Sequence, residues 1–167
     1  MHSMQHKIEG STLTLERVFS APRQKVWDVF TKPELFSKWW GPKGWSTEVK
    51  EFNFTEGGIN HYGMKCDDSE QTDWYGKYSW GKMVYEKINP IESIVYKDYF
   101  VDENAEVQVG MPVSESDLRF VEANEGTKLV CVVTYESEEA LKTVVEMGML
   151  QGIAMTWDNL EALLMKN

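Results

Sequence analysis

The sequence predicts a single α+β domain in which a curved antiparallel sheet of six or seven strands is covered by helices. Two observations lead to this fold class. Between residues 45 and 135, apolar and polar residues alternate in short runs separated by turn residues, which is typical of antiparallel strands. After residue 137 the apolar spacing becomes helical and continues almost to the C-terminus, which predicts one long helix over the concave face.

The first part of the chain predicts a strand followed by two short helices. Leu13 and Leu15 alternate with polar residues, which indicates a strand over about residues 12 to 19. Pro22 follows, at a position where a helix can begin without losing a backbone hydrogen bond. Apolar residues then recur at helical spacing, and Pro33 marks the expected start of a second short helix. We expect residues 1–11 to be a disordered lead-in and residues 12–165 to form one domain.

The central segment predicts strands with one bend. Trp45 and Val49 share one parity, whereas Phe52 and Phe54 take the other, which indicates a β-bulge near Lys50. A long strand is expected to begin at about Trp74 and to end near residue 88. Further strands are expected near residues 59–66, 93–101, 116–122 and 127–135.

The C-terminal segment predicts one continuous helix with a wide apolar face. Ser137 is a good N-cap, and the helix is expected to end at about Met165. Gly148 and Gly152 lie inside it, where each glycine costs up to about 1 kcal/mol relative to alanine. They either let the helix pack closely on the sheet or leave room for a ligand, and the sequence leaves both alternatives open.

Charge and composition disfavour several classes of partner. The formal net charge is −10 and no segment is dense in Lys or Arg, which argues against binding to nucleic acid or to an anionic membrane. No stretch approaches the roughly 18 apolar residues that a membrane span needs, so no membrane insertion is expected. The two cysteines have no metal-ligand spacing around them. We expect a cytoplasmic protein with free thiols and neither metal nor cofactor.

Several linked motifs resemble a known family. Residues 17–22 (RVFSAP), Val26-Trp27 and residues 39–42 (WWGP) are similar to the opening of the AHSA-type branch of the SRPBCC superfamily, also called START-like or Bet v 1-like. Gly57-Gly58 after an acid-rich stretch, and the ending from Glu146 to Leu160, are similar to later signatures of this branch. The resemblance covers about residues 12 to 164 and implies a helix-grip fold with a cavity between the sheet and the C-terminal helix.

The resemblance also implies a range of functions. Members of the superfamily carry lipids, sterols, polyketides or aromatic antibiotics, and a few are enzymes. The branch is named after an activator of the ninety-kilodalton heat-shock-protein ATPase, so a chaperone is an alternative partner. Family membership therefore predicts the architecture better than the function.

The chain is rich in aromatic residues and methionine, which suit the walls of an adaptable apolar cavity. Asn60 stands where the family usually has an aromatic residue. This indicates either a hydrogen-bonding group on the cavity wall or a shifted strand. The residues predicted to bind the ligand are Asn60, Tyr62, Met64, Tyr78, Trp80, Met149, Gly152 and Trp157.

The sequence assigns no catalytic residue. It contains no nucleophile elbow, zinc-protease motif, phosphate-binding loop or dinucleotide fingerprint. His61 is the one histidine in a predicted strand, and its parity directs it away from the cavity. Asp98 and Glu146 could face either the cavity or solvent, and the interpretation favours solvent for both.

Three hypotheses follow. The favoured one is a non-enzymatic binder or carrier of a hydrophobic or aromatic small molecule. The second is a co-chaperone-like interaction module. The third is a cavity-based enzyme, hydrolase-like or cyclase-like, which would require a buried polar pair inside the pocket.

Overall fold

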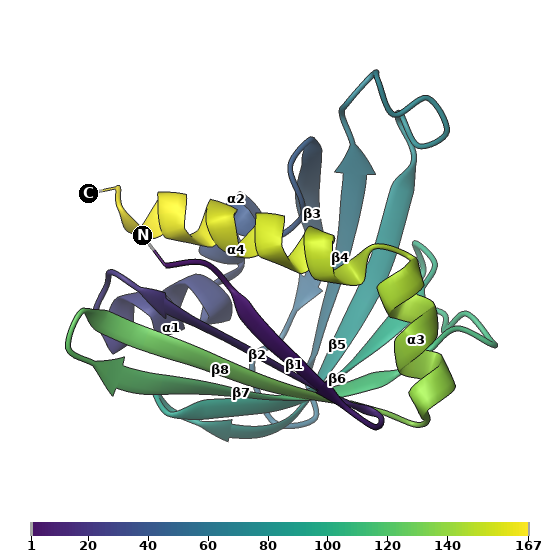
Figure 1. The fold of residues 1–167 in the computed structure, drawn as a ribbon. Helices are drawn as coiled ribbons and strands as arrows, with labels where there is room; N and C mark the ends of the chain where they lie inside the picture. The colour runs from purple at the N-terminus through teal and green to yellow at the C-terminus, as the bar shows by residue number, and fades with distance from the viewer. Residues whose placement is uncertain (1, 167) are drawn as a thin grey trace.

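The computed structural model describes residues 2–166, and an eight-stranded antiparallel sheet curves around the C-terminal helix (Figure 1). The order of strands across the sheet is β1-β2-β8-β7-β6-β5-β4-β3. The strands are β1 (Gln5–Glu9), β2 (Thr12–Phe19), β3 (Trp45–Phe52), β4 (Ile59–Cys66), β5 (Tyr78–Asn89), β6 (Ser93–Val101), β7 (Ser114–Ala123) and β8 (Gly126–Tyr135). The helices are α1 (Arg23–Thr31), α2 (Pro33–Trp39), α3 (Glu138–Glu146) and α4 (Met149–Leu164). The predicted fold class is confirmed, with one or two strands more than expected.

The additional strand lies in the expected lead-in. Residues Gln5–Glu9 form β1, which pairs with β2 so that Ile8 lies opposite Leu13. The expectation of a disordered segment therefore does not hold for these residues, while Met1 lies outside the described part of the chain. All five residues of β1 are exposed. An edge strand with no buried face leaves no alternating pattern in the sequence, so its pairing could not be predicted.

The expected single C-terminal helix is broken into two. α3 ends at Glu146, and α4 begins after Gly148, which adopts a left-handed conformation with a φ of 90°. Glycine adopts this conformation without a steric penalty, so it allows the chain to change direction here. Figure 1 shows α3 turned away from the axis of α4. Because both helices bury apolar residues, the helical spacing in the sequence continues across the break.

Of two predicted details of the sheet, one is confirmed and the other is wrong. The register of β3 against β4 shifts between Val49 and Glu51, which confirms the bulge near Lys50. β5 begins at Tyr78 rather than at Trp74. Trp74 instead lies in the turn-rich segment before β5, with its ring 5.9 Å from that of Trp45.

The C-terminal half of α4 is anchored to the sheet and to the segment after α2. The guanidinium Nη1 of Arg17 lies 2.6 Å from Oδ1 of Asp158. Arg17 is only 3% exposed, so this strand residue points inward under the helix. The amide of Asn159 donates to the carbonyl of Gly41 at 2.9 Å. These contacts fix the C-terminal half of α4 on the sheet.

None of the helices within residues 2–166 has the length and apolar character of a membrane span.

Candidate functional site

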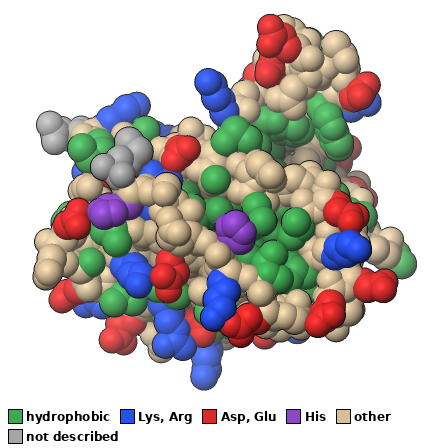
Figure 2. Space-filling view, in the orientation of Figure 1, with side chains coloured by type: hydrophobic (Ala, Val, Ile, Leu, Met, Phe, Trp, Pro, Cys, Tyr) green, Lys and Arg blue, Asp and Glu red, His purple; other side chains and the backbone are tan. Residues whose placement is uncertain are grey.

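A cavity of about 370 Å³ lies between the concave face of the sheet and the α3–α4 segment. Leu15 and Leu118 contribute to its floor, and Met149 and Ile153 of α4 contribute to its roof. Met147, in the link between α3 and α4, lines the cavity and is also 57% exposed, so the cavity reaches the surface at this link. Figure 2 shows hydrophobic side chains gathered on the face around α3 and the neighbouring end of α4.

Gly152 decides how much space the roof leaves. It lines the cavity, and a Cβ atom added to it would meet no atom within 4 Å. The alternative of close helix packing at this glycine is therefore wrong. The missing side chain leaves room under α4.

Five of the eight predicted ligand-binding residues line the cavity with the expected orientation. Tyr62 and Met64 extend from the inner face of β4, while Met149, Gly152 and Trp157 lie on α4. This arrangement follows from strand alternation in β4 and from helical spacing in α4. Whether these residues bind a ligand stays a prediction.

Tyr78 and Trp80 were expected to face the cavity, and the structure places their rings on the opposite face. The two rings stack at 5.1 Å, and the ammonium of Lys50 lies 4.8 Å from the Trp80 ring. The Trp80 ring covers Gly63, which is why a Cβ at Gly63 would approach it to 2.3 Å. Trp80 therefore borders the cavity with its ring on the outer face of the sheet, and Tyr78 does not line the cavity.

A second aromatic–glycine crossing explains the error. On the cavity side, Gly81 of β5 lies directly beside the ring of Tyr62, and a Cβ there would come within 2.3 Å of the phenol oxygen. The inner face of β5 must therefore carry a glycine at this position, because the ring of Tyr62 fills the space. The rings of Tyr78 and Trp80 lie on the outer face of β5 instead.

Asn60 lies on the inner face of β4 but outside the cavity. Its side chain is fully buried, and Nδ2 lies 3.8 Å from the sulfur of Met83. Its Oδ1 has no hydrogen-bond partner. The expectation that Asn60 contributes a polar group to the ligand pocket is therefore wrong, because the cavity ends before this residue.

Asp98 lies inside the cavity, contrary to the interpretation that favoured solvent. The hydroxyl of Tyr62 lies 3.1 Å from Oδ1 and 3.3 Å from Oδ2 of its carboxylate. Burial raises the pKa of Asp98 from 3.8 to about 7, although hydrogen bonds from Tyr62 and from the backbone of Tyr99 act in the opposite direction. The sequence carried a signal for this position, since Asp98 shares its parity with Ile94, Tyr96 and Phe100.

The other titratable groups around Asp98 stay neutral near pH 7. Burial raises the pKa of Tyr62 and of Tyr96 well above the usual value for tyrosine, and that of Tyr135 to about 12. Burial also raises the pKa of the Cys131 thiol to about 12. The cavity therefore combines an apolar wall with hydroxyl groups around one carboxyl group.

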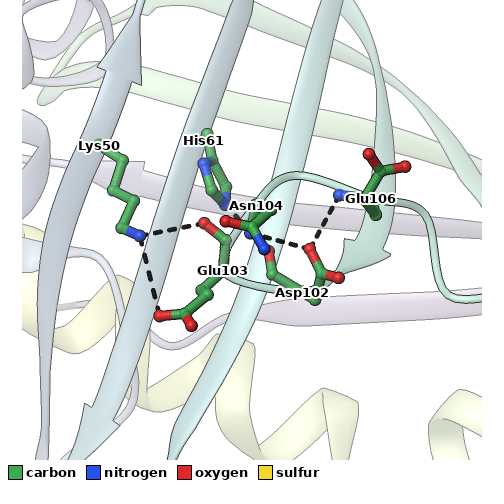
Figure 3. A network of polar contacts seen from close by, with 6 residues as sticks. All are labelled: Lys50, His61, Asp102, Glu103, Asn104 and Glu106. Atoms are coloured by element: carbon green, nitrogen blue, oxygen red, sulfur yellow. Dashed lines mark hydrogen bonds and ion pairs between the residues drawn. The ribbon is translucent and has the colours of Figure 1, made fainter.

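His61 faces away from the cavity, as predicted, and supports a loop. Its Nε2 lies 3.1 Å from the carbonyl oxygen of Asp102, and the ring is buried. Figure 3 shows the loop after β6 closing over this histidine, with Oδ1 of Asp102 accepting from the backbone amides of Asn104 and Glu106. Glu146 is exposed at the end of α3, as the interpretation favoured. No cluster of three or more His, Cys, Asp or Glu suited to a metal occurs among residues 2–166.

The position of Asp98 predicts an unusual dependence of stability on pH. Its folded-state pKa of about 7 lies above its ordinary value of 3.8, so between these values the folded protein binds more protons than the unfolded chain. The free energy of unfolding therefore falls as pH rises from about 4 to about 7. Asp98→Asn removes this loss and is expected to stabilise the protein by roughly 1–3 kcal/mol at about pH 8.

Urea unfolding of both proteins across this pH range checks the prediction. The stability difference between Asp98→Asn and the wild type must grow with pH and level off above about pH 7. Two parallel curves would contradict the assignment of Asp98 to a buried, proton-binding position.

The curved antiparallel sheet, the C-terminal helix and the cavity between them define a helix-grip domain with a largely apolar site that opens to the surface at the α3–α4 link. The family model described as Activator of Hsp90 ATPase homolog 1-like protein matches residues 20–165, and the chain belongs to this family. The motifs in the sequence thus identified the correct branch. No protein with a curated description matches the sequence.

Solved structures agree with this assignment. A crystal structure of a protein from Mycobacterium smegmatis is 28% identical, with a TM-score of 0.85 over 98% of this chain and 96% of that chain. A solution structure from Staphylococcus epidermidis is 30% identical, with a TM-score of 0.81 over 96% and 93% of the two chains. The AHSA1 protein from Silicibacter pomeroyi, at 18% identity and a TM-score of 0.69 over 92% and 96%, shares the fold.

Proposed function

We propose that the protein binds an apolar or aromatic small molecule in the cavity under α4. The observation that carries this proposal is the open space at Gly152, in a roof whose neighbouring residues are apolar. Removal of apolar ligand surface from water would contribute about 25 cal/mol per Å². Met64, Met147 and Met149 line the cavity with flexible side chains that can adapt to the shape of a ligand.

A neutral fluorescent probe tests the proposal. N-phenyl-1-naphthylamine emits strongly only in apolar surroundings, and Trp40 and Trp157 line the cavity as energy donors. We expect saturable binding of one probe molecule with a Kd of roughly 1–100 μM, because apolar burial then exceeds the costs of association. Probe emission that does not saturate during the titration, and that persists when the protein is unfolded in urea, would contradict the proposal.

The Asp98–Tyr62 contact favours a cavity-based enzyme as a second candidate. It is a polar pair inside the pocket, and a carboxyl group with a pKa of about 7 is suited to general acid–base catalysis. Product analysis of bound ligands separates the two candidates. Conversion by the wild type but not by Asp98→Asn would support the enzyme, and release of unchanged ligand would support the binder. A chaperone partner rests on the family description alone and stays a prediction.

A further inference from the structure

The cavity has an unbalanced charge composition. Asp98 is the one formally charged residue among the described residues that line it, and no Lys, Arg or His contributes to the wall. No cationic side chain of residues 2–166 forms an ion pair with Asp98 either. Asp98 is half-buried, and a carboxylate partly withdrawn from water without a counterion is destabilised, so this site can accommodate a positive charge that the chain itself does not supply.

The groups that face Asp98 come from every strand around it. Tyr62 of β4 donates its hydroxyl hydrogen to the carboxylate, and the backbone amide of Tyr99 also hydrogen-bonds to it. Ser114 of β7 lies opposite Asp98 in the sheet register. The ionisable groups nearby are those of Tyr85 (β5), Tyr96 (β6), Tyr135 and Cys131 (β8), and burial raises the pKa of each. On α3 and α4, no described lining residue is titratable.

We propose that the ligand of this cavity is a cationic amphiphile, an apolar or aromatic body carrying one basic aliphatic amine whose ammonium group pairs with the carboxylate of Asp98. This inference rests on the proposed function and names the chemical class of its ligand. The apolar body occupies the space below Gly152, and the ammonium donates hydrogen bonds to the carboxylate. The net charge of −10 favours the approach of a cation over that of an anion.

The pairing links binding to protonation. Below about pH 7 Asp98 is largely protonated and offers no counterion, so an ammonium ligand must displace its proton on binding. Amine affinity therefore rises with pH through this range, and proton release accompanies binding near pH 7. A neutral ligand of the same shape lacks both effects.

Calorimetric titration with three matched probes tests the inference: 1-naphthylmethylamine, the neutral 1-naphthylmethanol and the anionic 1-naphthoic acid. At about pH 8 we expect the amine to bind at least about 10-fold more tightly than the alcohol, and the acid most weakly. Titration of the amine near pH 7 in buffers of different ionisation enthalpy is expected to reveal proton release.

Two variants and a control variant test whether the preference for the amine and the proton release depend on Asp98. Asp98→Asn is expected to reduce the amine's advantage over the alcohol to less than about 3-fold and to abolish proton release. Asp117→Asn, which removes the same charge from the outer face of β7, should leave both unchanged. Tyr62→Phe removes a hydrogen bond to the carboxylate and should move the pH midpoint of amine binding upward.

The outcomes separate the two proposals. Equal binding of amine and alcohol, unaffected by Asp98→Asn, would overturn the cationic class and leave the apolar binding function standing. Failure of all three probes and of N-phenyl-1-naphthylamine would overturn both proposals.

Discussion

Gly152→Leu is expected to abolish binding of N-phenyl-1-naphthylamine, with at least a 100-fold loss of affinity. The new side chain enters the cavity, because a Cβ at this position already faces open space. It therefore occupies the volume that the ligand would need. The variant should fold, since leucine gains up to about 1 kcal/mol in helix propensity over glycine and buries further apolar surface.

Gln151→Leu is the matched control, because the same side chain is placed on an exposed position of α4 one residue earlier. Its probe affinity should equal that of the wild type. Gly152→Ala should bind with intermediate affinity. Unchanged binding by a folded Gly152→Leu protein would place the ligand outside the cavity and reject the proposed site.

Trp39→Ala is expected to be the most destabilising single substitution considered, lowering the free energy of unfolding by about 3–5 kcal/mol. Trp39 is 1% exposed, and its ring lies 4.7 Å from that of Phe30 and 5.9 Å from that of Phe36. Its indole Nε1 also donates to the carbonyl of Val29 at 2.9 Å. The side chain thus joins α1 to α2, and alanine would leave a large cavity between them.

Urea unfolding of Trp39→Ala, Trp39→Phe and Trp74→Ala measures this contribution. Trp74 is 49% exposed, so its truncation should change stability by less than about 0.5 kcal/mol. Trp39→Phe should lie between the two alanine variants, since it keeps most of the ring contacts. A Trp39→Ala protein as stable as Trp74→Ala would show that the aromatic cluster of α1 and α2 does not hold the fold.

The sheet and the helices that cover it could be predicted because each buries one face. Burial of one face makes apolar residues recur at a regular spacing along the sequence, every second residue in a strand and every three or four in a helix. The bulge near Lys50 followed from the same pattern, since a change of parity requires an inserted residue. The strand β1 has no buried face and left no such signal. The break at Gly148 was hidden because α3 and α4 both bury apolar residues on either side of it.

The candidate site could be predicted only where the large apolar or aromatic residues of a strand are also the ones that point into the cavity. Tyr62 and Met64 follow the alternation of β4, and both line the cavity. On β5 the large aromatic residue and the inward-pointing residue are different ones. The inner position carries Gly81 because the Tyr62 ring crosses it, whereas Trp80 covers Gly63 on the outer face. Such crossings between strands depend on three-dimensional packing, which alternation within one strand does not contain.

Asp98 illustrates a different limit. Its parity with Ile94, Tyr96 and Phe100 indicated that it shares a face with apolar residues. The pattern alone could not say whether that face is covered. The answer depends on how α4 and the α3–α4 link close over the sheet.

Methionine methyl NMR tests most directly whether the space under α4 receives a ligand. Met64 and Met149 line the cavity, whereas Met155 and Met165 lie outside it on exposed positions. Saturation with N-phenyl-1-naphthylamine is predicted to shift the methyl signals of Met64 and Met149 and to leave those of Met155 and Met165 in place. Shifts confined to Met155 and Met165, with the cavity methyls unmoved, would contradict an internal binding site.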